Sequence, residues 1–302
     1  MPVLLDCRLV AQEHLDWVAR EKLSLGFRPV LATVHFAPRK NAGSLQYRQM
    51  IARDAAKLDI GDMSLEADTE AELVQTIGKL NADPKVTGIM VFYPIGGRIA
   101  DEDLMDLVSP QKDVEGLHSL NLGYLVKYKR WLDEARGIKC VVPATAKAVV
   151  KTLQSRDVRF EGAFAAVVNN SMRVGKPLGL MLENLGATVV ECYDKTRLED
   201  LRECVRRSDV VVTAVPDPNF TLDPKWVKPG AAILDVSYQG NIDVQGLDSH
   251  VAFATAPDNR IGQVTRAMMF VNLIYCAQNA KKDRDSAPAP IGRDLPGSRR
   301  DV

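Results

Sequence analysis

Short apolar runs alternate with longer amphipathic stretches in the N-terminal part of the chain. Runs rich in β-branched residues at 30–36, 63–67 and 86–92 predict strands, and the stretches 44–58 and 69–80 between them predict helices. A proline and two glycines follow the third run and open the chain into a loop. Strands separated by helices of this length indicate parallel crossovers, so the pattern predicts an α/β fold.

The same alternation resumes after a proline at position 143. Pro143 interrupts the chain and Thr145 can cap the helix that follows, so we place a domain boundary here. Further runs predict a helix with a broad apolar surface at 262–281 and four strands at 164–168, 188–192, 210–214 and 232–236. The segment 282–302 is charged and rich in proline and glycine, which is typical of a disordered tail.

One βαβ unit of the second half carries a specific local signal. The run 165–168 leads into a polar turn, a helical stretch and a second strand that ends at Asp194. A carboxylate at this strand tip can accept hydrogen bonds from both hydroxyls of an adenosine ribose, and it repels a 2′-phosphate. The unit therefore favours NAD over NADP. Only Gly175 remains of the usual three glycines, and any βαβ unit needs a tight turn at this point.

Composition and charge argue against several other classes of function. The 302 residues include 39 basic and 39 acidic side chains, so no net charge attracts nucleic acid or an acidic membrane surface. The five cysteines and four histidines lack metal-ligand spacing, and we expect no metal site. No apolar run is long enough to span a bilayer and no signal sequence is visible, which predicts a cytoplasmic protein.

Five short segments stand in an informative order along the chain. The segment Lys112-Asp113-Val114-Glu115-Gly116-Leu117 is flanked by similar short matches at 88–91, 142–145, 174–178 and 227–231. Together they resemble the methylenetetrahydrofolate dehydrogenase/cyclohydrolase family, whose signature is Lys-Asp-Val-Asp-Gly. The resemblance implies two α/β domains: a folate-binding domain at 1–144, completed by a helix at 264–281, and a Rossmann-type NAD-binding domain at 145–263. It also implies a homodimer.

The resemblance assigns roles to particular residues. It implies that the reduced folate contacts Ser44, Tyr47, Asp113, Glu115, Pro257 and Thr265. Tyr47 and Glu115 are the expected catalytic residues, with Tyr47 against the pterin and p-aminobenzoyl groups and Glu115 on the pterin nitrogens. The implied NAD site contains Thr145, Asn169, Asn170, Ser171, Arg173, Val174, Gly175, Asp194, Ala214 and Val215. Ser44 and Thr145 also fit helix caps, and Asp113 also fits a structural turn.

Two departures from the family fall on its hydrolytic chemistry. Ile51 replaces the lysine that follows the family's tyrosine by four residues, and Phe92 replaces a glutamine. Removing a hydride from methylenetetrahydrofolate needs alignment with a nicotinamide and no proton transfer. Hydrolysis of the methenyl product needs an activated water. We therefore expect a dehydrogenase without cyclohydrolase activity, as in the monofunctional NAD-dependent members of the family.

The cofactor side departs from the family in the same direction. Where NADP-using relatives have an arginine and a serine, this chain has Asn170 and Asp194, and Arg173 is the remaining candidate partner for a 2′-phosphate. Three alternatives stay open: a bifunctional enzyme that activates water with other residues, a catalytically silent NAD-binding homologue, and hydride transfer on another reduced pterin. The loop at 257–265 matches the family poorly, which supports the silent homologue.

Overall fold

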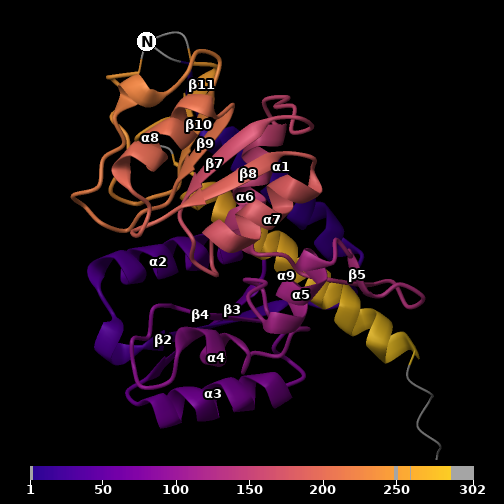
Figure 1. Ribbon diagram of the computed structural model, residues 1–302. Helices are drawn as coiled ribbons and strands as arrows, with labels where there is room; N and C mark the ends of the chain where they lie inside the picture. Colours follow the sequence, from indigo (N-terminus) through magenta and orange to yellow (C-terminus); the bar gives the residue numbers. More distant parts are fainter. Residues whose placement is uncertain (1–2, 248–250, 259, 287–302) are drawn as a thin grey trace, which may run out of the picture.

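The chain folds into two α/β units that share one long helix (Figure 1). The computed structural model describes residues 3–247, 251–258 and 260–286. Its strands are β1 (Leu4–Leu5), β2 (Val30–Phe36), β3 (Gly61–Ala67), β4 (Gly88–Val91), β5 (Trp131–Asp133), β6 (Ile138–Lys139), β7 (Phe164–Val168), β8 (Thr188–Cys192), β9 (Val210–Thr213), β10 (Ala232–Asp235) and β11 (Phe253–Thr255). Its helices are α1 (Cys7–Leu23), α2 (Ala42–Lys57), α3 (Glu70–Ala82), α4 (Asp101–Met105), α5 (Ser119–Val126), α6 (Ala144–Gln154), α7 (Gly175–Asn184), α8 (Leu198–Arg207) and α9 (Gly262–Ser286).

The first unit is built on a three-stranded parallel sheet in the order β3-β2-β4. Its central strand β2 is apolar and almost wholly buried, as expected for a strand covered on both faces. Partly buried and exposed positions alternate along β3, because this edge strand has one face toward solvent. All three predicted strands of this half are present, and β2 spans the predicted residues 30–36.

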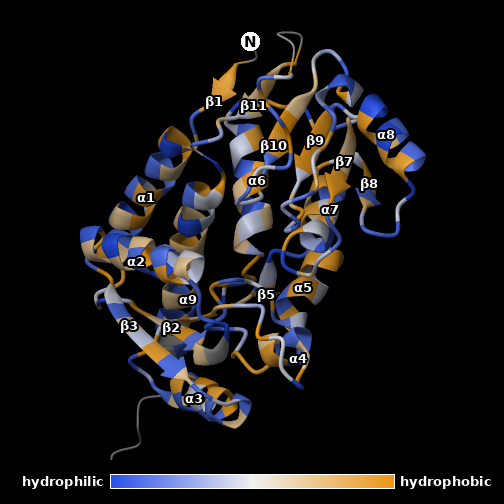
Figure 2. Ribbon diagram, turned by 90° about the vertical axis from the view of Figure 1, so that its left-hand side faces the viewer, coloured by the Kyte–Doolittle hydropathy of each residue, from blue (hydrophilic) through white to orange (hydrophobic). Residues whose placement is uncertain are grey.

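The second unit is a six-stranded parallel sheet in the order β1-β11-β10-β9-β7-β8. The predicted strands at 164–168 and 188–192 are confirmed, and those near 210 and 232 are each one residue shorter than predicted. In Figure 2 the strands β7, β9 and β10 are largely hydrophobic, whereas α8 is hydrophilic over much of its surface. The sequence gives no indication of β1, in which Leu4 pairs with Ala254 of β11. The second sheet therefore takes an edge strand from the start of the chain.

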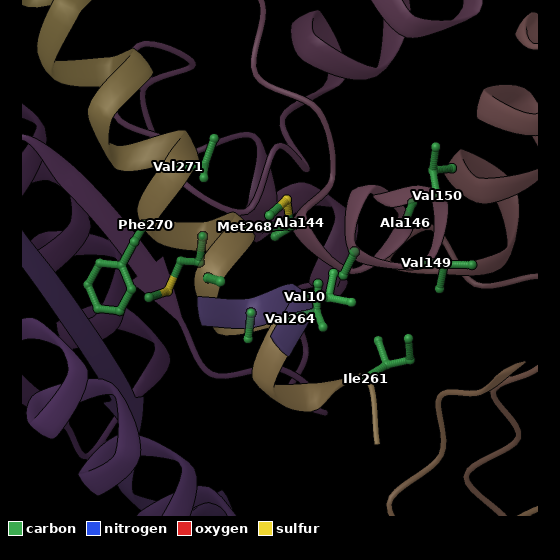
Figure 3. Packing of buried hydrophobic residues seen from close by; sticks show 14 of the residues in the cluster. Val10, Ala144, Ala146, Val149, Val150, Ile261, Val264, Met268, Phe270 and Val271 are labelled. Carbon is green, nitrogen blue, oxygen red and sulfur yellow. The ribbon is translucent and has the colours of Figure 1, made fainter. Parts of the chain in front are cut away.

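The long helix α9 is the common core element of both units. It packs on α1 and α6 and reaches β4 and the β5–β6 hairpin. Figure 3 shows Val264, Met268 and Val271 of α9 beside side chains of α1 and α6. A helix that is apolar on nearly every side must be buried. Among the described residues, no helix is both long and apolar enough to cross a membrane.

The predicted C-terminal end of helix α9 and the predicted N-cap of helix α6 need correction. Helix α9 continues to Ser286, so residues 282–286 are helical and are not part of a tail. Contacts far apart in sequence account for the extension: Lys282 donates to the Gly137 carbonyl at 2.6 Å, and Asp283 pairs with Arg136. Residues 287–302 lie outside the described part of the chain. Helix α6 has Pro143 at its N-cap, so Thr145 lies inside the first turn and does not cap it.

One buried amide on α9 connects the parts of the molecule. The Asn272 side chain is fully buried, and its Nδ2 donates to the carbonyls of Val114 and Val142, both at 2.9 Å. Its Oδ1 accepts from Nζ of Lys147 at 3.1 Å. Asn272 therefore fixes the loop between α4 and α5, the boundary near Pro143 and helix α6 against α9.

We expect Asn272→Leu to lower the free energy of unfolding by about 3 kcal/mol or more, since it removes three hydrogen bonds and leaves buried partners unpaired. Urea denaturation measures this loss. The matched control is Asn279→Leu on the same helix, which loses two bonds to the Lys139 backbone. A loss in Asn272→Leu no larger than in Asn279→Leu would contradict the connecting role of Asn272.

Candidate active site

A cavity of about 280 Å³ lies where the two units meet. Its walls combine Tyr47 of α2 and Glu115 of the loop between α4 and α5 with Thr145, Arg173 and Thr265. The remaining lining residues are Met90, Leu117, Ala144, Val174, Val236, Gly262 and Met269. Val174 and Val236 follow the carboxyl ends of β7 and β10, the edge at which α/β sheets bind ligands. A larger hollow of about 690 Å³ lies at the amino ends of these strands.

Helix α2 positions Tyr47 in this cavity. The helix begins with a capping box in which Ser44 N donates to Asn41 Oδ1 at 2.9 Å and Asn41 N donates to Ser44 Oγ at 3.1 Å. Asn41 is thus the N-cap, and Ser44, the third residue of the helix, completes the capping box and does not line the cavity. Burial raises the pKa of the Tyr47 hydroxyl above its ordinary value, so the phenol is neutral at physiological pH.

Two neighbours of Tyr47 are apolar at positions where the resemblance to the family implies polar groups. Ile51, one turn along α2, is 0% exposed and belongs to the hydrophobic core. The Phe92 ring stacks on His35 with ring centres 3.7 Å apart and meets Tyr47 edge-on at 6.5 Å. Burial lowers the pKa of His35, which favours its neutral ring. Ile51 and Phe92 therefore offer no group that can move a proton.

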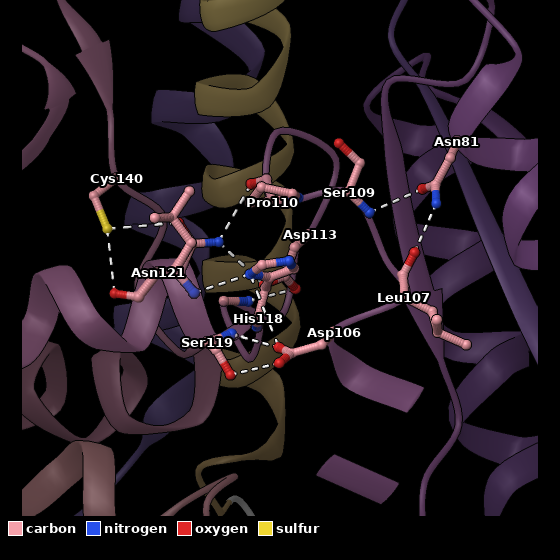
Figure 4. Close-up of polar contacts among 12 residues, drawn as sticks. Asn81, Asp106, Leu107, Ser109, Pro110, Asp113, His118, Ser119, Asn121 and Cys140 are labelled. Carbon is pink, nitrogen blue, oxygen red and sulfur yellow. Dashed lines mark hydrogen bonds and ion pairs between the residues drawn. The ribbon is translucent and has the colours of Figure 1, made fainter. Parts of the chain in front are cut away.

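Asp113 holds the loop that carries Glu115. Its Oδ1 accepts from the backbone N–H groups of Glu115 at 3.2 Å and Gly116 at 2.8 Å. Its Oδ2 accepts from His118 N at 2.8 Å and Asn121 Nδ2 at 3.1 Å (Figure 4). Because these donors occupy both oxygens of a buried carboxylate, Asp113 shapes the loop. It is not among the residues that line the cavity.

Only glycine fits at position 116 of this loop. Its backbone has a φ of +72°, and a Cβ there would lie 2.5 Å from the Val142 carbonyl carbon. The close approach turns the neighbouring Glu115 side chain toward the cavity. Burial and the Asp113 charge raise the pKa of Glu115 to about 8, although Arg173 opposes the shift. Glu115 is therefore mainly protonated at pH 7 and can donate a hydrogen bond.

Asn169 organises the loop between β7 and α7. Its Oδ1 accepts from Ser171 N at 2.9 Å, Ser171 Oγ at 2.8 Å and Gly175 N at 2.9 Å. Its Nδ2 donates to the Ala214 carbonyl at 2.8 Å and so connects the ends of β7 and β9. A Cβ at Gly175 would lie 2.1 Å from the Asn169 carbonyl oxygen. This close approach explains why one glycine of the fingerprint is retained.

Asp194 and Arg173 lie in different surroundings. Asp194 follows β8, its side chain is 73% exposed, and it pairs with Lys195 at 2.9 Å. Arg173 lines the cavity with Glu115, and its Nη1 donates to the Tyr93 carbonyl of the first unit at 3.1 Å. The guanidinium thus contacts the first unit, although the sequence left it as a candidate partner for a 2′-phosphate.

Two family models match the chain, and together they cover most of it. One describes the tetrahydrofolate dehydrogenase/cyclohydrolase catalytic domain and matches residues 5–115. The other describes the NAD(P)-binding domain of the same enzymes and matches residues 143–281. The chain belongs to the tetrahydrofolate dehydrogenase/cyclohydrolase family. The expected family and the two-domain α/β fold are thereby confirmed, and the protein is a member of a methylenetetrahydrofolate dehydrogenase family.

Individual relatives agree with this assignment. "Bifunctional protein FolD" of Methanoculleus marisnigri is 29% identical over 287 residues, 91% of this chain and 96% of the relative. A 5,10-methylenetetrahydrofolate dehydrogenase from Bombyx mori superposes with a TM-score of 0.81 and 28% identity, covering 92% of this chain and 98% of that one. A FolD from Trypanosoma brucei, complexed with NADP and an inhibitor, has a TM-score of 0.82 and 26% identity over 92% and 97% of the two chains. The bifunctional relatives favour the bifunctional alternative over the expected dehydrogenase-only activity.

The cavity includes part of the family site expected from the sequence. Tyr47, Glu115, Thr145, Arg173, Val174 and Thr265 line it, whereas Ser44, Asp113 and Pro257 do not. Asn170 is exposed on the nucleotide loop, and Val215 N donates to Asn241 Oδ1 at 2.8 Å. The roles of these residues, the domain limits, a homodimer and a cytoplasmic location stay predictions.

Several residues that line the cavity were not predicted from the sequence. Met90, Leu117, Ala144, Val236, Gly262 and Met269 line it, and four of them fall in matched segments or at the end of a predicted strand. Arg266 was also missed. Its Nε lies 2.8 Å from Asp54 Oδ2, and its guanidinium lies 5.9 Å from the centre of the Tyr47 ring. Nothing in the local sequence indicates that arginine.

The described residues contain no cluster of three or more histidine, cysteine, aspartate or glutamate side chains that could hold a metal ion. The polar groups of the cavity are instead a phenol, a carboxyl, hydroxyls and a guanidinium. These groups are suited to binding and orienting an organic molecule through hydrogen bonds.

We expect Glu115→Gln to stabilise the protein at pH 8 and to have little effect near pH 4. The pKa of Glu115 is about 8 in the fold and lies above its unfolded value of roughly 4.3, so the folded state binds the proton more tightly. Its contribution to stability is therefore present below the unfolded pKa and is lost as the pH rises toward 8. Urea denaturation across this range measures the effect. The exposed Glu203→Gln is the control, and a wild-type-to-Glu115→Gln difference that does not change with pH would refute the raised pKa.

Proposed function

We propose that this protein oxidises 5,10-methylenetetrahydrofolate by hydride transfer to NAD. The observation that carries the proposal is the cavity in which Tyr47 and Glu115 of the first unit meet Thr145, Arg173 and Val174 of the nucleotide-binding unit. Family membership supplies the substrate class. In such a cleft the protein contributes alignment, because hydride transfer needs the two reacting carbons held close together.

The chemistry of the nucleotide loop fits NAD. The exposed Asp194 carboxylate at the tip of β8 would bind the ribose hydroxyls, and the neutral Asn170 gives a 2′-phosphate no counter-charge. Arg173 donates to the Tyr93 carbonyl in the first unit, which supports the same preference. When bound, NAD supplies the hydride acceptor. Asn169 holds the loop in shape through its hydrogen bonds to Ser171, Gly175 and Ala214.

The residues of the first unit bind and orient the folate. Glu115, with its proton retained at pH 7, has both a donor and an acceptor for the pterin nitrogens. The neutral Tyr47 ring gives the pterin and p-aminobenzoyl groups a surface to pack on. Met90, Leu117 and Met269 make other walls of the cavity apolar and exclude water from the reacting carbon.

Hydrolysis of the methenyl product is the second candidate activity, and the names of the relatives favour it. The local residues favour its absence. The position of the family lysine holds a buried isoleucine, and Phe92 stacks on a histidine whose pKa is lowered by burial. We therefore propose that the protein is a dehydrogenase that does not accelerate hydrolysis. The same assays test the two remaining alternatives. These are hydride transfer on a reduced pterin other than tetrahydrofolate and a catalytically silent role.

The cofactor preference is tested by Asp194→Ser. We expect the wild type to reduce NAD faster than NADP with methylenetetrahydrofolate. We expect the variant to shift the ratio of the two kcat/KM values toward NADP by about tenfold or more, because it removes a charge that repels the 2′-phosphate. Asp103→Ser, an exposed aspartate on α4, is the control. A wild type that prefers NADP would refute the role of Asp194, and no reduction of either cofactor would favour the silent homologue.

The absence of cyclohydrolase activity is tested with methenyltetrahydrofolate itself. We expect the methenyl absorbance to fall at its spontaneous rate when the purified protein is present. The reason is that neither Ile51 nor Phe92 can transfer a proton. A bifunctional family member serves as the positive control. Turnover clearly above the spontaneous rate would establish the bifunctional alternative.

A further inference from the structure

A second cavity, of about 500 Å³, shares no lining residue with the cavity of the candidate active site. It is formed by the end of α5, the β5–β6 hairpin and the helices α6, α7 and α9, which lie close together in Figure 1. Its volume is typical of sites for small organic molecules. Apolar side chains from α5, α6 and α7 form part of its wall, namely Leu125, Val150, Met181 and Leu185.

The charged side chains of this cavity are all positive. They are Lys129, Arg130, Lys139, Lys147 and Lys151, and no acidic side chain lines the cavity with them. We call this cavity the lysine pocket. None of the five forms a salt bridge within the ranges that the structure describes. The whole chain is electrically neutral, so this group is a local excess of positive charge.

Aromatic rings hold two of these lysines in place. The Tyr275 ring has Lys139 Nζ 4.3 Å and Lys147 Nζ 4.6 Å from its centre. Lys139 Nζ also lies 5.8 Å from the centre of the Trp131 ring. Cation–π contacts at these distances reduce the freedom of side chains that would otherwise move in solvent. The ammonium groups are therefore partly ordered before any ligand arrives.

Lys147 distinguishes the lysine pocket from a group of solvated surface lysines. It is only 8% exposed, and its Nζ donates to Asn272 Oδ1. Burial, together with the positive charges of Lys151 and Lys139, lowers the pKa of Lys147 to about 7. A smaller hollow on the α1 side of Lys147 brings Glu13, His14 and Arg20 near it, and the other groups facing it are Tyr275 and Cys276 of α9. Glu13 is the one carboxylate among these neighbours, against three further cationic side chains, Arg20, Lys139 and Lys151.

We propose that the lysine pocket binds a small polyanion that carries a flat ring, with the anionic groups on Lys139, Lys147 and Lys151 and the ring against the aromatic side chains. Charge-assisted bonds from several ammonium groups are the usual means of holding phosphates and carboxylates. Trp131 and Tyr128 supply aromatic faces at the same cavity. Nucleotides and the p-aminobenzoyl-polyglutamate portion of folates share this chemistry. The site is independent of hydride transfer in the cleft.

Isothermal titration calorimetry on the full chain tests the proposal with ATP, tripolyphosphate, adenosine and p-aminobenzoyl-triglutamate. We expect ATP or the triglutamate to bind more tightly than tripolyphosphate or adenosine alone, and the tighter of the two identifies the source of the ligand. Lys147→Met and Lys139→Met should each weaken binding by about tenfold or more, because each removes a bond to a charged group. Lys79→Met, an exposed lysine on α3, is the control and should leave binding unchanged.

A second readout follows the proton on Lys147. At pH 8 an anion beside Lys147 raises its pKa, so binding takes up a proton and the heat differs between HEPES and Tris buffers. This uptake should disappear in Lys147→Met and persist in Lys139→Met. Unchanged affinity in both lysine variants would put the ligand elsewhere and overturn the proposal. Tripolyphosphate binding as tight as ATP and the triglutamate would overturn the role of the ring.

Discussion

The structure depends on a single buried amide. Asn272 lies between buried apolar residues of α9, Val271 and Leu273, and each polar atom of its side chain has a partner. An unpaired amide at this depth would raise the free energy of the folded state. The helix α9 is therefore stable in this position only when all three hydrogen bonds are formed. Two of the partners, the carbonyls of Val114 and Val142, directly precede Glu115 and the Pro143 boundary. The hydrogen bonds of this buried residue therefore position two backbone segments that border the cavity.

Two loops then approach neighbouring backbone so closely that a side chain is excluded. At Gly116 the loop of the first unit meets Val142, and at Gly175 the nucleotide loop folds over Asn169. Each glycine works with a neighbouring polar residue that accepts several backbone hydrogen bonds, Asp113 in one loop and Asn169 in the other. Hydrogen bonds within each loop fix its backbone, so the side chains that the two loops direct into the cavity have fixed positions.

Much of the fold can be predicted from the sequence because buried parallel strands are continuous apolar runs. Strands β2 and β7 have the predicted bounds for this reason, and the edge strand β8 has them although it is only partly buried. Strand β1 is too short to leave a pattern, and the end of α9 depends on Lys282 and its distant partner. Within the site, Asp194 follows from its place after a strand, whereas apolar walls such as Met90 and Met269 look like any core residue. The contact of Arg173 with Tyr93 could not be predicted, because it joins residues far apart in the chain.

The pairing of β1 with β11 has a consequence for how such a protein can evolve. The sheet of the nucleotide-binding unit is completed by Leu4 and Leu5, and both units pack on α9 near the other end of the chain. Neither unit is a self-contained module that recombination could transfer intact to another gene. New specificity in this architecture therefore arises through substitutions at individual positions within an undivided chain, and this is the role we propose for Ile51, Phe92 and Asp194.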